Sequence, residues 1–193
     1  MKTKSQNLQS GFTLVEALVA ITILIVGVIG PLSLAAQGIG DGIFARNQVA
    51  ANYLAQEALE IVINKRYALA RKAQYLPPTS PATIFSNLEI QNCISATTAG
   101  NFCSVNATDA TIQPDCPASD ETNCRLVFNK QAFLYSLPPT PNSGVLTTGA
   151  VFTRLVQIRL VSSDEIAVTV TVKWNNKEVP KSLTLVEYLF TKG

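Results

Sequence analysis

The amino-acid sequence predicts an α+β fold in which one long N-terminal helix packs on a C-terminal antiparallel sheet. The first observation is an apolar stretch over residues 12–36, which continues into an amphipathic helical pattern as far as Gln74. The second is the alternation of apolar and polar residues over residues 166–175, the two-residue period of a β-strand. An amphipathic helix and a one-sided sheet must each cover an apolar face, so we expect them to pack together.

The composition excludes several classes of protein. Of the 193 residues, 47% are hydrophobic and 15% are charged, whereas intrinsic disorder requires low hydrophobicity and high net charge. The net charge of +2 gives no basis for nucleic-acid binding, which needs clustered cations. The chain has no histidine, which removes the usual general base and the commonest metal ligand. We therefore expect a membrane-linked protein without enzymatic activity, cofactor or bound metal.

The apolar stretch over residues 12–36 is long enough to span a bilayer. As a helix it would be about 37 Å long, at about 1.5 Å per residue. Lys2 and Lys4 precede it without an acidic neighbour, so the positive-inside rule predicts a cytoplasmic N-terminus and an external remainder. Residues 33–35 offer a small-x-small cleavage site, but the stretch exceeds the roughly 7–15 apolar residues of a secretory signal peptide.

Glu16 argues against both a cleaved secretory signal and a plain membrane anchor. A carboxylate inside a spanning helix costs at least about 2.5–3.5 kcal/mol, so it normally has a function and a partner. The alternative is that Glu16, which is four residues from Phe12, lies shallow enough to reach the membrane interface.

Residues 10–16, Ser-Gly-Phe-Thr-Leu-Val-Glu, resemble the class III signal of type IV pilins and pseudopilins, which reads G-F-T-L-x-E. The resemblance implies that a membrane prepilin peptidase removes residues 1–11 by cutting between Gly11 and Phe12, and then methylates the Phe12 amine. It also implies an assembly role for Glu16, whose carboxylate would pair with that amine in its own or a neighbouring subunit. Pairing would remove much of the cost of burial and fix the axial register between helices.

The second half of the helix, residues 37–76, is amphipathic. Polar residues recur every four positions on one face and apolar residues supply the other. The polar face holds Gln48, Asn52, Gln56, Glu60 and Asn64, and the apolar face Ala50, Leu54, Ala58, Ile61 and Leu69. Pro77 and Pro78 end the helix.

The membrane half of the helix, residues 12–36, contains a weak stretch at residues 27–31, Gly-Val-Ile-Gly-Pro. Its proline removes one backbone hydrogen bond from the helix. One interpretation is an ordinary kink, which neighbouring helices tolerate in membranes. The other follows from the resemblance, because the corresponding stretch of pilins melts when subunits pack into a filament. The sequence leaves both open.

The C-terminal part of the chain is expected to form the sheet of a globular head, residues 77–193. Three strand-like runs make an antiparallel meander over residues 151–190: residues 152–161, 166–175 and 182–190. The helix is the only long element available to cover its apolar face. A helix on an antiparallel sheet is the globular fold of type IV pilins, so the resemblance and the periodicity agree.

Residues 77–150 are rich in proline, serine, threonine and asparagine and are expected to be a variable, surface-displayed loop region. Within it, the apolar runs over residues 83–90 and 126–137 are expected to be strands or brief helices. The run Val-x-Val-x-Val-x-Trp that ends at Trp174, together with residues 182–189 and helix residues 51–60, resembles the minor-pilin group called PilV or GspI-like. Trp174 itself is expected to be a core or strand-end aromatic residue.

The four cysteines all lie between residues 77 and 150: Cys93, Cys103, Cys116 and Cys124. An even number in an oxidising compartment predicts two disulfides, and four cysteines allow three connectivities. We favour Cys93–Cys103 with Cys116–Cys124 because each closes a short loop; free thiols are the alternative if the source organism does not oxidise its exported proteins. No C-x-x-C pair indicates zinc. The acidic residues of this region lack regular calcium-loop spacing and are expected to be solvated: Asp109, Asp115, Asp120 and Glu121.

The resemblance implies a structural subunit, a minor pilin or pseudopilin of a type IV pilus or a type II secretion pseudopilus. Such a subunit would serve filament assembly, adhesion, motility, DNA uptake or protein secretion. Its partners would be the major pilin, other minor pilins or pseudopilins, the prepilin peptidase, the inner-membrane assembly platform and, before assembly, membrane lipid. It would begin as a single-pass membrane protein and end in a filament at the cell surface or in the periplasm. The alternative is a membrane-tethered extracellular binding domain, an adhesin or DNA receptor that carries a pilin-type signal.

Overall fold

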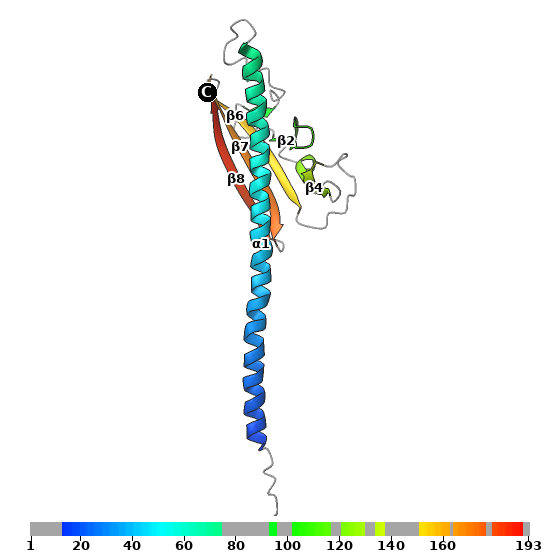
Figure 1. Ribbon diagram of the computed structural model, residues 1–193, viewed down its shortest axis with the longest axis vertical. Coiled ribbons are helices and arrows are strands. Elements are labelled where there is room, and N and C mark those ends of the chain that lie inside the picture. Colours follow the sequence, from blue (N-terminus) through cyan, green and yellow to red (C-terminus); the bar gives the residue numbers. More distant parts are fainter. Residues whose placement is uncertain are drawn as a thin grey trace, which may run out of the picture. The chain divides into compact units, whose positions relative to one another are not determined.

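The computed structural model describes residues 13–74, 93–95, 102–116, 121–129, 134–137, 151–162, 164–176 and 179–190. In this part of the chain, helix α1 (Leu14–Gln74) is followed by strands that form a mainly antiparallel sheet (Figure 1). The α+β class expected from the sequence is therefore confirmed. The chain divides into two compact units, Met1–Phe44 and Ala45–Gly193, and α1 contributes residues to both.

In the first unit, α1 is a continuous helix with an exposed apolar surface. Residues 13–39 are all exposed, and the helix passes through Pro31 without interruption. The weak stretch at residues 27–31 therefore does not break the helix in a single chain. Apart from the adjoining backbone of the helix itself, a Cβ added to Gly27 or Gly30 would meet no atom of the described residues within 4 Å. Among the described residues, no contact within one molecule requires glycine at these two positions.

The three C-terminal strands form the expected meander. β6 (Phe152–Ser162) pairs with β7 (Glu165–Asn176), which pairs with β8 (Val179–Phe190), both antiparallel. β8 begins at Val179, before the expected start at Ser182, and includes Pro180. Proline is tolerated at this position because it is near the strand end and β8 lies at an edge of the described sheet.

The expectation of loops is wrong for residues 102–116, which form the hairpin of β2 (Phe102–Asn106) and β3 (Thr111–Cys116). The run over residues 126–137 forms strands, one of the two expected outcomes, and the run over residues 83–90 lies outside the described residues. The short elements of this region are β1 (Ile94–Ser95), η2 (Thr122–Cys124), β4 (Arg125–Asn129) and β5 (Leu134–Ser136).

Three of the short strands, β1, β2 and β4, pair with β6, whereas β3 pairs with β2 and β5 pairs with β4. β1 pairs with β6 at Ile158 and Arg159, β2 pairs with it at Val156, and β4 pairs with it at Phe152 and Thr153. Each pairing therefore covers only one or two positions of β6. Strands this short lack a periodic pattern that a sequence could reveal. The long strand β6 supplies backbone hydrogen-bond partners to β1, β2 and β4.

The core of the second unit lies between α1 and the sheet. All five residues of the polar helix face are exposed, as expected. Of the expected apolar face, only Leu54 and Ala58 are buried, and the buried stripe also includes Ala51, Ala55 and Val62. These small side chains let the helix lie close to β6 and β7, whose inward residues are Phe152, Val156, Ile158, Ile166, Val168, Val170, Val172 and Trp174. Trp174 is a core residue, as expected.

The two disulfides join Cys93 to Cys103 and Cys116 to Cys124, which is the connectivity favoured from the loop lengths. Their Cα–Cα distances are 5.7 and 5.9 Å, within the usual range for a disulfide. The second disulfide, Cys116–Cys124, forms a small core with Leu155, against which Phe102 packs. Leu155 lies on the face of β6 opposite to the buried core residues Phe152 and Val156, so this disulfide loop covers the outer face of the sheet.

Candidate assembly site

The first turn of α1 is capped by Thr13. The Thr13 carbonyl accepts the first helical hydrogen bond from the Ala17 N–H, at 3.2 Å. The Thr13 hydroxyl accepts a second bond from the backbone N–H of Glu16, at 3.3 Å. Thr13 is therefore the N-cap and Glu16 is the third helical residue, the positions of threonine and glutamate in a capping box.

The capping role was missed from the sequence, although its signal, Thr-x-x-Glu, is present. In such a box the side chain at the Glu16 position accepts the backbone N–H of the N-cap residue, which would be a local function that needs no second subunit. A carboxylate in the first turn also interacts favourably with the positive end of the helix dipole, worth about 0.3–1 kcal/mol. Two interactions therefore compete to explain this residue: the cap, and the expected ion pair with the Phe12 amine.

The two residues of the expected processing site, Gly11 and Phe12, lie outside the described residues. Glu16 is exposed at the first turn, so its carboxylate is not committed to the protein core. It can accept hydrogen bonds and neutralise a cation close to the start of the helix. The Phe12 amine that processing would create is one such cation.

The exposed surface of α1 between Leu14 and Ile39 is strongly apolar. Its large side chains are 46–79% exposed. They are Leu14, Val15, Leu18, Val19, Ile21, Ile23, Leu24, Ile25, Val26, Val28, Ile29, Leu32, Leu34 and Ile39. In the part of the chain that the structure describes, α1 is the helix long and apolar enough to cross a membrane, and its most apolar window is not buried within the chain. This surface needs lipid or other helices to cover it.

In the second unit, Arg154 attaches α1 to the sheet, a role that sequence reasoning also missed. Its side chain is 1% exposed, and its guanidinium donates to the Leu54 carbonyl at 3.0 Å and to the Val105 carbonyl at 2.6 Å. It also pairs with the Glu57 carboxylate at 2.6 Å. One cation therefore joins the helix, β2 and β6.

Burial lowers the pKa of Arg154, whereas the hydrogen bond and charge of Glu57 raise it. The net effect is a lowered pKa, yet an arginine guanidinium stays charged at physiological pH. A second arginine, Arg66 of α1, donates to the carbonyl of Phe190 in β8. In the sequence, the only indication of the role of Arg154 is its inward position on a strand, where alternation alone predicts an apolar residue.

Comparison with known proteins supports the assignment of the N-terminal segment. Residues 6–30 match the family described as the prokaryotic N-terminal methylation motif. No curated protein and no solved structure matches the chain. The chain therefore carries a type IV pilin signal, followed by one long helix and a mainly antiparallel sheet, an arrangement consistent with the type IV pilin fold.

The match ends at residue 30 and does not reach the sheet, so it does not test the PilV or GspI-like subgroup. The motif points to a structural protein rather than an enzyme, and to assembly with pilins after processing. Among the described residues no cluster of acidic or cysteine side chains could hold a metal ion. Asp109, one of the expected solvated acids, accepts hydrogen bonds from the backbone and side chain of Thr111.

Proposed function

We propose that this protein is a minor pilin or pseudopilin, a structural subunit of a type IV pilus or a type II secretion pseudopilus. The observation that carries the proposal is the apolar surface of α1 from Leu14 to Ile39, exposed in the single chain and overlapped by the methylation motif. Such a surface is stable in lipid before assembly and against neighbouring helices afterwards.

Processing by the prepilin peptidase is the first step of the mechanism. Cleavage after Gly11 would create a charged amine on Phe12, four residues before Glu16. In an apolar environment an unpaired cation is costly, so a nearby carboxylate stabilises the processed N-terminus. Before cleavage, the leader keeps Lys2 and Lys4 on the cytoplasmic side and the head outside.

Assembly is the second step. Helices that bury their Leu14–Ile39 surfaces against one another form the core of the filament, and the globular heads, residues 77–193, face outward. The partners are the major pilin, other minor pilins or pseudopilins, and the inner-membrane assembly platform. A cation and a carboxylate in each subunit would fix the axial register, because any other stagger leaves charges unpaired in an apolar core.

The test is mass spectrometry of the protein expressed with a prepilin peptidase. We expect an N-terminus at Phe12 that carries one methyl group, and a Gly11→Glu variant that keeps its leader. Gly11→Ala is the matched control and should be processed. An intact start at Met1, or a start at Ala36, would contradict the proposal.

Fractionation separates the proposed subunit from a tethered binding domain. A filament subunit should appear in sheared filaments as well as in membranes. A processed protein that remains only in the membrane fraction would favour the extracellular binding domain with a pilin-type signal.

A further inference from the structure

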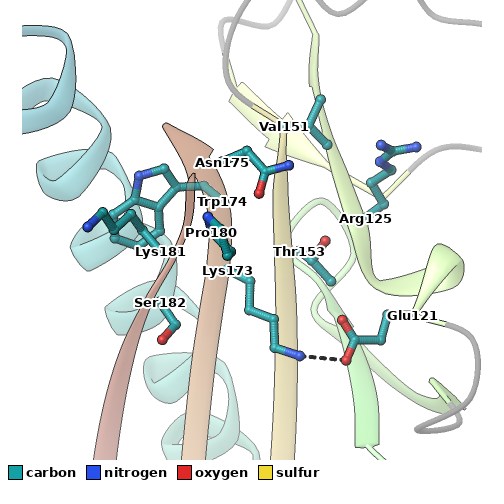
Figure 2. A pocket seen from close by; sticks show the side chains of 10 residues that line it. All are labelled: Glu121, Arg125, Val151, Thr153, Lys173, Trp174, Asn175, Pro180, Lys181 and Ser182. Carbon is teal, nitrogen blue, oxygen red and sulfur yellow. Dashed lines mark hydrogen bonds and ion pairs between the residues drawn. The ribbon is translucent and has the colours of Figure 1, made fainter. Parts of the chain in front are cut away.

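A groove of about 700 Å³ lies at the end of the sheet where β7 gives way to β8 (Figure 2). Ten residues line it: Glu121, Arg125, Val151, Thr153, Lys173, Trp174, Asn175, Pro180, Lys181 and Ser182. All belong to the second unit, Ala45–Gly193. A groove of this volume is within the usual range of small-ligand sites.

The strand register aligns four of these residues in one row across the sheet. Arg125 of β4 lies opposite Thr153 of β6, and Thr153 lies opposite Lys173 of β7. Lys173 in turn lies opposite Ser182 of β8. Residues directly opposite one another share a face of the sheet, and this face is the outer one because the next residue of β6, Arg154, contacts α1.

The row alternates cation, hydroxyl, cation, hydroxyl. Because neighbouring strands are about 4.8 Å apart, Arg125 and Lys173 emerge from the sheet about 10 Å apart, with Thr153 between them. Asn175 and Pro180, opposite one another in the register, add an amide and a flat apolar surface beside the row. The row therefore combines two separated positive charges with neutral hydrogen-bonding groups.

The charge of the groove is positive. Its lining contains Arg125, Lys173 and one carboxylate, Glu121. It also contains Lys181, which lies opposite Trp174 and therefore on the inner face of the sheet. Lys173 pairs with Glu121 at 2.6 Å, yet 46% of its side chain is exposed, so it can also contact a second anion. Arg125 is an exposed residue, and a guanidinium suits a carboxylate, which it can bind through two parallel hydrogen bonds.

The groove is unsuited to a peptide strand or to single-stranded nucleic acid. Pro180 has no N–H to offer to a strand added at the edge of β8. Trp174 is 4% exposed and cannot provide a platform on which bases stack. Hydroxyl and amide groups between separated cations match a ligand with many hydroxyls and carboxylates at intervals.

We propose that this groove binds an acidic oligosaccharide, a short chain of sugars that carry carboxylates. Arg125 and Lys173 would each bind one carboxylate, and Thr153, Asn175 and Ser182 would bind hydroxyl groups. Glu121 is the opposing charge: it holds Lys173 in place and weakens the attraction for an anion. The proposal concerns the head alone and does not depend on filament assembly.

Trp174, the only tryptophan of the chain, is buried in the core on the inner face of the sheet, so binding is measured by isothermal titration calorimetry. The experiment uses the full chain in detergent micelles, titrated with tetragalacturonate, with neutral maltotetraose and with a single-stranded oligonucleotide of equal charge. We expect a saturable change with tetragalacturonate and a much weaker response to the other two. The same titration at raised salt measures the electrostatic share of the affinity.

Arg125→Gln and Lys173→Gln should each weaken tetragalacturonate binding about tenfold or more, because each removes a hydrogen bond between charged groups. Glu121→Gln should strengthen it severalfold, since it removes a repulsive carboxylate and releases Lys173. Arg159→Gln is the matched control: this arginine is exposed on the same face of β6, outside the groove, and its loss should change affinity little.

Three results would overturn the proposal. The first is no saturable response to tetragalacturonate. The second is equal binding of the neutral sugar, which would show that the cations do not select the ligand. The third is tighter binding of the oligonucleotide, which would show a general polyanion site. Circular dichroism of each variant checks that lost binding is not lost folding.

Discussion

Replacing Glu16 by glutamine separates the two interactions that the first turn of α1 offers. Glutamine can take the same place as glutamate in a capping box, so the substitution removes the charge and keeps the cap. If Glu16 only caps the helix and interacts with its dipole, the loss is about 0.3–1 kcal/mol, at most about fivefold in an equilibrium. If it neutralises the Phe12 amine, breaking the pair costs about 3–5 kcal/mol, more than about 100-fold.

The assay is quantitative blotting of sheared filaments and membranes at matched expression. We expect Glu16→Gln to be processed and inserted normally, because processing precedes packing, and to be strongly depleted from filaments. Thr13→Ala is the matched control. It removes the hydroxyl that accepts the Glu16 N–H, costs about 1 kcal/mol as a lost cap, and retains the charge, so it should reduce incorporation only modestly.

Two outcomes would refute the reasoning. Wild-type incorporation of Glu16→Gln would show that the charge pair does not recruit this subunit. Equal depletion of Thr13→Ala and Glu16→Gln would assign the effect to the helix cap, and the ion pair would then have no support.

Four further outcomes are expected. Arg154→Ala should lower the free energy of unfolding, measured in urea titrations, by about 3–5 kcal/mol, because it leaves buried carbonyls and Glu57 without their cation. Glu57→Gln should lower the free energy of unfolding by less, since the Glu57 side chain is 40% exposed. Gly30→Ala should stabilise the helix of the detergent-solubilised monomer by about 1 kcal/mol, measured by circular dichroism. If residues 27–31 melt on assembly, the same variant should enter filaments less well than the wild type. Unchanged incorporation would favour an ordinary kink. Non-reduced peptide mapping should link Cys116 to Cys124, and removing this second disulfide should cost about 2–4 kcal/mol; a link from Cys124 to Cys93 would contradict the structure. The carboxyl of Asp109 should titrate below its usual pKa of 3.8, chiefly because the Thr111 side chain donates a hydrogen bond to it. The stabilisation that this carboxylate gives to the turn is therefore present above pH 3.8 and is lost as the pH falls through the lowered pKa. Thr111→Val should return the pKa, measured by NMR, toward 3.8.

The long helix and the meander could be predicted from the sequence because both show a periodic pattern of apolar and polar residues. The apolar stretch, the polar stripe and the alternation before Trp174 are local patterns, and each reports which face of an element is buried. The processing signal was equally readable, because a peptidase recognises a short contiguous segment. A pattern of this kind needs no knowledge of distant residues.

Features that depend on pairing between distant segments were decided by tertiary structure. The strands of residues 102–116 pair with each other, and β2 joins the sheet by pairing with β6 at Val156; their own sequence has no periodic pattern that predicts these pairings. Arg154 reads locally as a misplaced charge, and only packing against the carbonyls of Leu54 and Val105 makes its burial favourable.

The row of Arg125, Thr153, Lys173 and Ser182 shows the same limit for a binding site. Its members come from four strands, and the register of each pair places them side by side. A one-residue slip of any strand would move its member to the opposite face. The sequence by itself determined the pilin-type signal and the main secondary-structure elements of this protein. The strand register decided which side chains meet on the surface of its head.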